Sequence, residues 1–263
     1  MSVSFQEDYE RDGYISPVSI IDADQAAQHR VSLERAEAEI GPLHYKFKAH
    51  TILKSPMELA INPIILDTIE ALLGPNILLY NATYIVKEPQ TPAHVSWHQD
   101  LTYWGLSAAD QVSVWLALSP ATRQNGCMRM LPGSHKRGRF DHHKTDDDTN
   151  VLNLGQTVRD VNEAQSRLCP LEPGEASFHH GWTLHASGPN QSDDRRIGLN
   201  FQYFKTDMRQ VNHDQDTAML VRGIDEFHHF KPADIPATSD LDHVALERLE
   251  ALNETMKSAY QDV

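Results

Sequence analysis

Cysteine is scarce in this chain, which has only Cys127 and Cys169 among 263 residues. Their spacing fits neither a disulfide framework nor a zinc site, so we expect two free, buried thiols in a reducing compartment. No segment approaches the ~20 apolar residues that a membrane helix needs. The first eight residues hold no basic region and no apolar run, so no secretory signal is expected. These absences favour a cytoplasmic protein without a membrane partner.

Positive charge is also low, because 23 Lys and Arg residues face 37 Asp and Glu residues, for a formal net charge of −14. General binding to nucleic acid needs a basic surface, so nucleic acid is not an expected partner. The length suits one large domain, and the hydrophobic fraction of 40% is enough for a core. The composition leaves the oligomeric state open.

Helical patterns lie at the two ends of the chain. Residues 20–40 are rich in strong helix formers, and residues 58–73 carry apolar side chains at helical spacing up to Gly74-Pro75. Residues 241–260 repeat this pattern. We therefore expect a helical N-terminal third and one C-terminal helix.

The middle of the chain predicts strands, which are rich in β-branched and aromatic residues and bounded by Pro and Gly. They are expected at 77–87, 112–118, 128–131, 176–178 and 196–204. Short strands separated by such turns indicate a jelly roll with helices packed outside it. The acidic segment 141–150 predicts an exposed loop, and residues 141–154 are a candidate lid.

The most informative stretch is Trp97-His98-Gln99-Asp100. In an extended strand, residues i and i+2 point to the same face, so His98 and Asp100 could reach one metal ion. A second histidine would complete the two-histidine, one-carboxylate triad, which suits Fe(II) and leaves coordination positions open. His185 is the best candidate, while His179 and His180 are rivals a few residues away.

Three segments together resemble the phytanoyl-CoA dioxygenase family of Fe(II)- and 2-oxoglutarate-dependent oxygenases. They are the WHQD segment at 97–100, the block NGCMRMLPGSHK at 125–136, and the segment HASGPN at 185–190 with its continuation to Arg196. The block at 125–136 is the most distinctive. The resemblance runs from about Gly13 to Asp234, and it implies a double-stranded β-helix core. On this basis we expect a single domain over residues 1–263, with the jelly-roll core at about 77–205.

The resemblance also implies roles for individual residues. His98, Asp100 and His185 match the iron ligands. Arg196 matches the residue that pairs with the distal carboxylate of 2-oxoglutarate, which a guanidinium binds with two parallel hydrogen bonds. Arg195 is the rival, because strand alternation lets only one of the two arginines face the pocket.

Two further positions resemble co-substrate contacts in related hydroxylases. Trp104 is expected to pack along 2-oxoglutarate and Ser187 to hydrogen-bond its carboxylate, although an interface tryptophan and a turn-capping serine are the alternatives. For Lys87 and Tyr84 a structural role is favoured.

The implied reaction uses O₂ to hydroxylate a small molecule and converts 2-oxoglutarate to succinate and CO₂, with ascorbate as a candidate reductant. Related halogenases carry Gly or Ala where this chain has Asp100, so hydroxylation is favoured over halogenation. Desaturation, cyclisation and a non-enzymatic metal- or ligand-binding module stay open, as does a zinc hydrolase, since the same ligands serve zinc. A small metabolite is favoured over an acyl-CoA, because the tight basic cluster at 136–139 reads as a solvated turn.

Overall fold

The computed structural model describes residues 3–152, 156–212, 214–232 and 234–261. The chain forms two compact units, which are described separately. Unit 1 comprises residues 1–28, 85–103 and 114–198. Unit 2 comprises residues 29–84, 104–113 and 199–263. The single domain expected over 1–263 stays a prediction.

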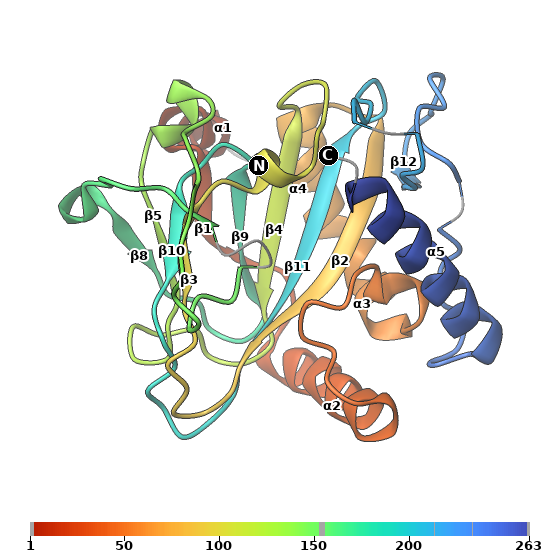
Figure 1. Cartoon of the computed structure of the whole chain (residues 1–263), viewed down its shortest axis with the longest axis horizontal. Coiled ribbons are helices and arrows are strands. Elements are labelled where there is room, and N and C mark those ends of the chain that lie inside the picture. Colours follow the sequence, from red (N-terminus) through yellow and green to blue (C-terminus); the bar gives the residue numbers. More distant parts are fainter. Residues whose placement is uncertain (1–2, 153–155, 213, 233, 262–263) are drawn as a thin grey trace. The chain divides into compact units, whose positions relative to one another are not determined.

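The larger sheet has six strands in the order β1-β9-β4-β11-β2-β12 (Figure 1). These strands are β1 (Tyr14–Ser19), β2 (Ile77–Lys87), β4 (Gln111–Ala117), β9 (Glu175–His180), β11 (Arg196–Lys205) and β12 (Met219–Arg222). β2, β4 and β11 are buried along almost their whole length, which explains their dense β-branched and aromatic sequences. The sheet extends beyond the predicted span of 77–205, because β1 and β12 join its edges.

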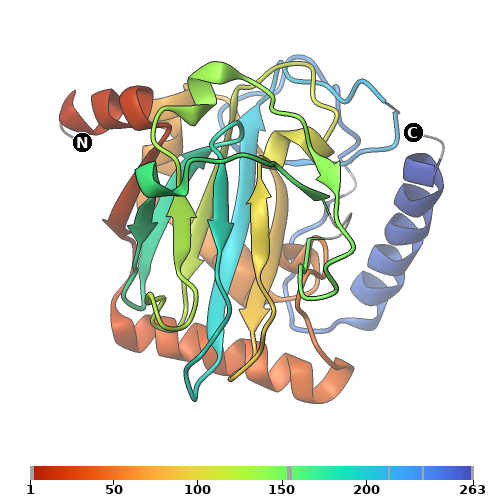
Figure 2. The ribbon, with the colours of Figure 1, turned by 60° about the vertical axis from the view of Figure 1, so that its left-hand side comes forward.

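The smaller sheet lies within unit 1 and has the order β3-β10-β5-β8 (Figures 1 and 2). Its strands are β3 (Val95–His98), β5 (Met128–Met130), β8 (Arg167–Cys169) and β10 (His185–Ser187). Each has only three or four residues. β5 was expected, and β3 overlaps the extended segment considered at 97–100, whereas β8 and β10 were not expected. Strands this short have too few residues to establish an alternating pattern, so long-range pairing determines them.

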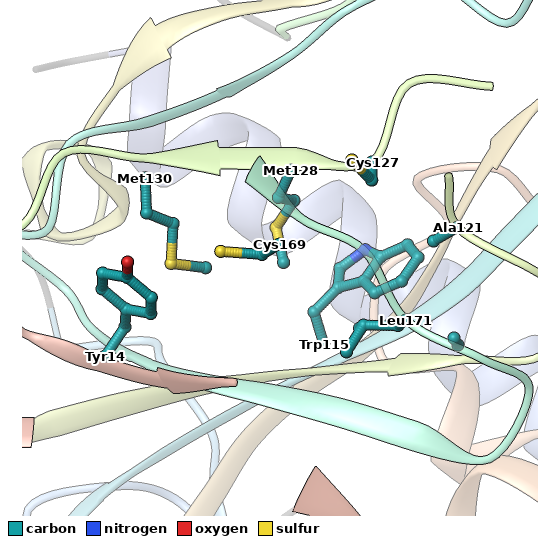
Figure 3. Close-up of a cluster of buried hydrophobic side chains, with 9 residues drawn as sticks. Tyr14, Trp115, Ala121, Cys127, Met128, Met130, Cys169 and Leu171 are labelled. Atoms are coloured by element: carbon teal, nitrogen blue, oxygen red, sulfur yellow. The ribbon is translucent and has the colours of Figure 1, made fainter. Parts of the chain in front are cut away.

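The core of unit 1 lies between these two sheets. Tyr14 and Trp115 project from strands of the larger sheet, and the sulfur-bearing side chains of Met128, Met130 and Cys169 face them from the smaller one (Figure 3). Both cysteines are buried and free. Two facing antiparallel sheets confirm the predicted jelly-roll class.

The chain also contains helices, and the ends of one of them, α4, follow local sequence signals. They are α1 (Val3–Asp12), α2 (Ala23–Ile40), α3 (Lys54–Ala60), α4 (Pro63–Leu73) and α5 (His243–Gln261), with the 3₁₀ turns η1 (Ala49–Thr51), η2 (Asp100–Tyr103), η3 (Ser134–Arg137) and η4 (Glu163–Gln165). The helix expected at 58–73 is two helices, because Pro63 begins α4 and Asn62 caps it. Gly74 ends α4 as expected, with φ 95°. Every helix in the described part of the chain is too short or too polar to span a bilayer.

Unit 2 contains a buried ion pair. The Lys48 ammonium donates to Asp234 Oδ2 at 2.6 Å and to the main-chain oxygens of Tyr80 and Thr217. Both charged side chains are almost fully buried, so each depends on the other for compensation. The pair ties the segment that follows β12 to strand β2.

Most of the acidic segment 141–150 is exposed, as predicted, although Asn150 is buried. A short ladder pairs this segment with residues that follow it. β6 (His143–Lys144) pairs with β7 (Gln156–Thr157) in antiparallel fashion. Residues 153 and 154 of the candidate lid lie outside the described residues, and its role as a lid stays a prediction.

Candidate metal centre

Two histidines meet because two short strands pair. His98 ends β3, His185 begins β10, and the two are directly opposite in the antiparallel register. Their ring centroids lie 4.0 Å apart. Residues 87 positions apart in the sequence are thus brought side by side by the smaller sheet.

Asp100 lies close to both histidines, but it lies in a turn and not in the expected extended strand. The strand ends at His98, and Asp100 is the first residue of the turn η2, so the prediction of an extended His-x-Asp segment is wrong. Its Oδ1 nevertheless lies 3.4 Å from Nε2 of His98 and 3.6 Å from Nε2 of His185. The intervening Gln99 is buried and its amide donates to Gly138 O and Trp182 O, both at 2.8 Å. These bonds hold the turn that aims the carboxylate at the two rings.

The two rings are anchored through their other nitrogens. Nδ1 of His98 lies 2.9 Å from the carbonyl oxygen of Ser96, and Nδ1 of His185 lies 3.0 Å from that of Thr183. A carbonyl only accepts, so each Nδ1 carries the proton and each Nε2 offers a lone pair. This arrangement is typical of histidines that bind metal.

The charge states also suit metal binding. Burial lowers the pKa of His185 well below its usual value, which keeps the ring neutral at physiological pH. Burial alone would raise the pKa of the Asp100 carboxyl, but the neighbouring His185, His179 and His98 outweigh it and hold the pKa well below its usual value. Neutral imidazole and ionised carboxylate are the forms that ligate.

These residues fit a divalent metal ion. The ligand atoms of His98, Asp100 and His185 all lie within 4.8 Å of one another, the one such group among the residues described. Two nitrogens and one oxygen form the donor set of non-haem Fe(II) sites with open positions. Their assignment as iron ligands stays a prediction that this geometry supports.

The two rival histidines lie outside the group of three candidate ligands. His179 is buried, and its Nε2 lies 3.3 Å from Oδ2 of Asp100. The rings of His98 and His185 face the other carboxylate oxygen, Oδ1. His180 lies next to it on β9, and its Nδ1 accepts a hydrogen bond from the Trp182 main-chain N at 2.9 Å. The structure thus brings His185, and neither rival, into the group of three.

The distinctive block at 125–136 supports the strand that carries His185. Ser134 Oγ accepts a hydrogen bond from the Leu184 main-chain N at 2.9 Å, one residue before the candidate ligand. A Cβ at Gly126 would lie 2.1 Å from the carbonyl oxygen of Gly188, so only glycine allows this close approach. Gly133 has φ 72°, a left-handed backbone conformation that favours glycine. The block therefore holds both ends of β10.

The two arginines before and at the start of β11 take opposite directions. Arg195 donates through Nε to both carboxylate oxygens of Glu88, at 3.0 and 3.1 Å. Arg196 is only 1% exposed, and its guanidinium lies 5.0 Å from the ring centre of Trp115, a core residue. Only Arg196 is therefore turned toward the interior of unit 1, which supports its assignment to the co-substrate.

Lys87, for which the sequence favoured a structural role, is a second basic residue buried in unit 1. Lys87 is 1% exposed, and its Nζ donates to Ser187 Oγ at 2.6 Å, to Ser187 O at 3.2 Å and to Gly188 O. Burial and the nearby charge of Arg196 lower the pKa of Lys87 to about 6. The available signal was a lysine in a strand whose pattern predicts complete burial, since lysine is rarely buried without a reason. Ser187 is thus brought beside a buried basic side chain.

Trp104 lies in unit 2. Its ring centroid is 5.9 Å from that of Tyr80, and its main-chain oxygen accepts from Gln210 Nε2 at 2.7 Å. These contacts are those of a packing residue. Its contact with 2-oxoglutarate stays a prediction.

Comparison with known proteins identifies relatives of this chain. The sequence model described as phytanoyl-CoA dioxygenase (PhyH) matches residues 9–198. A probable alpha-ketoglutarate-dependent hypophosphite dioxygenase of Stutzerimonas stutzeri is 32% identical over 145 residues, which cover 54% of this chain and 50% of that protein. The peroxisomal phytanoyl-CoA dioxygenase of Homo sapiens is 29% identical over 155 residues, which cover 57% of this chain and 46% of that protein. The match spans about half the length of these relatives.

A solved structure is similar over nearly the entire chain. The non-heme monooxygenase ThoJ, in its apo form, superimposes with a TM-score of 0.85 at 27% sequence identity. The similarity covers 98% of this chain and 100% of that one.

Proposed function

Because this chain belongs to the phytanoyl-CoA dioxygenase family, we propose that it is an Fe(II)- and 2-oxoglutarate-dependent dioxygenase. In the proposed reaction, an unactivated C–H bond of a small molecule becomes C–OH while 2-oxoglutarate becomes succinate and CO₂. One oxygen atom of O₂ enters the product and the other enters succinate. The convergence of the ligand atoms of His98, Asp100 and His185 within 4.8 Å carries the proposal.

Bound iron would supply the activation of O₂ that breaking such a C–H bond requires. His98 and His185 would hold it through Nε2 and Asp100 through a carboxylate oxygen. The protein's own contribution is to aim these three groups before the metal arrives, through the carbonyl anchors on each Nδ1. Three protein ligands leave room for 2-oxoglutarate and O₂.

Arg196 and Lys87 would hold the dicarboxylate. Both are buried in unit 1, and the charge of Arg196 lowers the pKa of Lys87, so the two basic groups lie near each other. A bound dianion would compensate the charge of Arg196 and favour protonation of Lys87 in a site that is shielded from water. Ser187 Oγ, already bonded to Lys87, would add a neutral hydrogen bond.

The pKa of Lys87 leads to a prediction about protons. At pH 7.5 a side chain with a pKa of about 6 is mostly neutral, and a carboxylate placed beside it raises that pKa. Binding of 2-oxoglutarate is therefore expected to take up a fraction of a proton. Calorimetric titration in two buffers of different ionisation enthalpy measures this uptake. Lys87→Met, which keeps the side-chain length, should lose it, and equal uptake in both proteins would contradict the role of Lys87.

The same pKa predicts a pH dependence of stability. Between about 6 and the ordinary 10.5, Lys87 is protonated in the unfolded chain and largely neutral in the folded protein. The unfolded state then binds more protons, so the free energy of unfolding should rise with pH across this window. Urea denaturation of ligand-free protein from pH 6 to pH 9 tests it. Lys87→Met should have a smaller slope than the native chain, and an unchanged slope would refute the prediction.

The carboxylate of Asp100 favours hydroxylation over halogenation, because it occupies the position at which a halide would need to bind. The substrate is proposed only as a small molecule. Of the basic cluster at 136–139, Arg137 lies over the ring of Phe140, with its guanidinium 4.6 Å from the ring centre. Lys136, Arg137 and Arg139 are all exposed, as expected of a solvated turn, so a smaller metabolite is favoured over an acyl-CoA.

The proposal is tested by incubating purified protein with Fe(II), 2-oxoglutarate, ascorbate and O₂ and measuring succinate. We expect a basal turnover that rises when a true substrate is added. Mass spectrometry of the product then separates the outcomes: gain of one oxygen atom indicates hydroxylation, and loss of two hydrogen atoms indicates desaturation or cyclisation. Absence of succinate, together with hydrolysis by zinc-loaded protein or with no activity at all, would overturn the proposal.

A further inference from the structure

The two oxygens of the Asp100 carboxylate face different partners. Oδ1 lies 3.4 Å from His98 Nε2 and 3.6 Å from His185 Nε2. Oδ2 lies 3.3 Å from Nε2 of His179, a residue of β9. One oxygen is thus directed to the candidate metal and the other to a third histidine.

His179 is held where it cannot easily turn away. It is 1% exposed, it is opposite Tyr14 in the β1–β9 register, and its ring centroid is 4.7 Å from that of His185. Within the described part of the chain, its Nδ1 is buried and makes no hydrogen bond. The ring proton of His179 is therefore assigned to Nε2, from which it is donated to the Asp100 carboxylate. A charge-assisted bond away from water is strong.

We propose that His179 is a positioning residue, which binds Oδ2 of Asp100 so that only Oδ1 is offered to the metal. The inference rests on the proposed function. A carboxylate that binds through both oxygens would take one more coordination position. The proposed reaction needs three positions beyond the protein ligands, two for 2-oxoglutarate and one for O₂. By occupying Oδ2, His179 would keep the third of these positions open.

His179 is not a fourth ligand in this account. Its Nε2 faces a carboxylate oxygen and carries the proton of that bond, so it has no lone pair to offer. The group of three ligand atoms that lie within 4.8 Å of one another also does not include it. A direct test must therefore separate a residue that donates to Asp100 from one that binds the metal.

The test uses Mn(II), which occupies such sites without turnover. Calorimetric titration should show that His179→Leu binds Mn(II) about 10- to 100-fold more weakly, as is common when a partner of a metal ligand is lost. His179→Gln keeps an N–H donor and should bind nearly as tightly as the native chain. His180→Leu, the neighbouring position on β9, is the matched control and should leave the affinity unchanged.

Crystal structures with Mn(II) give the second readout. In the native chain, only Oδ1 of Asp100 should bind the ion, with His179 on Oδ2, whereas in His179→Leu both oxygens should bind. Equal affinities of His179→Leu and the native chain would overturn the inference, and so would weak binding by His179→Gln, which would indicate a ligand. If His179→Leu does not fold, the crystal structure of the native chain with Mn(II) and the Mn(II) affinity of His179→Gln still test the inference. These results do not depend on succinate formation, so the proposed function can fail separately.

Discussion

Replacing His185 with alanine is expected to reduce 2-oxoglutarate turnover by more than about 100-fold, because losing even a partner of a metal ligand commonly costs 10- to 100-fold. His185 lies directly opposite His98 in the smaller sheet, and its Nε2 faces Asp100. Apart from His98 and His185, no described histidine belongs to this group of donor atoms. Succinate release at saturating 2-oxoglutarate and Fe(II) measures the effect, and Mn(II) titration should show a parallel loss of metal affinity.

His180→Ala provides the control for this result. Its ring lies on β9 and bonds to the main chain of Trp182, so most turnover should remain. The opposite pattern, with His180→Ala inactive and His185→Ala active, would show that the wrong histidine has been assigned to the metal. Thermal denaturation of both variants checks that each is folded.

Replacing Arg196 with alanine is expected to raise the KM for 2-oxoglutarate by about 10- to 100-fold, since a hydrogen bond to a charged group is worth about 1.5–3 kcal/mol. The side chain is buried against Trp115, where lost bonds to a carboxylate cannot be replaced by water. At saturating 2-oxoglutarate much of kcat should return, because the metal ligands are untouched. Arg196→Lys keeps the charge but loses the planar fork, so its KM should fall between those of the native chain and the alanine variant.

The neighbouring arginine is the matched control. Arg195 is paired with Glu88 near the surface, and such pairs contribute little, so Arg195→Ala should leave the KM for 2-oxoglutarate close to the native value. A large rise of KM in Arg195→Ala with a native-like Arg196→Ala would contradict the proposed orientation of the strand. Succinate formation at a series of 2-oxoglutarate concentrations distinguishes the two cases.

The roles of His179 and Lys87 share one physical feature. Each buried polar group donates to an acceptor that the proposed chemistry uses: His179 to the metal-binding carboxylate and Lys87 to Ser187. Burial of such groups costs free energy unless they are paired. We infer that the chain tolerates them here because they organise the site before metal and co-substrate bind.

Much of the architecture could be predicted from local sequence. β2 begins and ends where its β-branched and aromatic run does, and α4 ends at Gly74 as expected. The three family segments also identified His98, Asp100 and their surroundings without any knowledge of the strands that carry them. Such features depend on residue type, hydrophobic period and turn residues, which act over a few positions.

The sequence by itself therefore determined the class of the fold, the chemical types at the centre and the small set of candidates for each position. Tertiary structure alone decided which histidine lies opposite His98, which arginine turns inward, and that Lys87 lies beside Ser187. It also replaced the expected extended His-x-Asp segment with a turn. The reason is that each of these depends on the pairing and register of strands far apart in the chain, where a shift of one residue reverses the direction of every side chain.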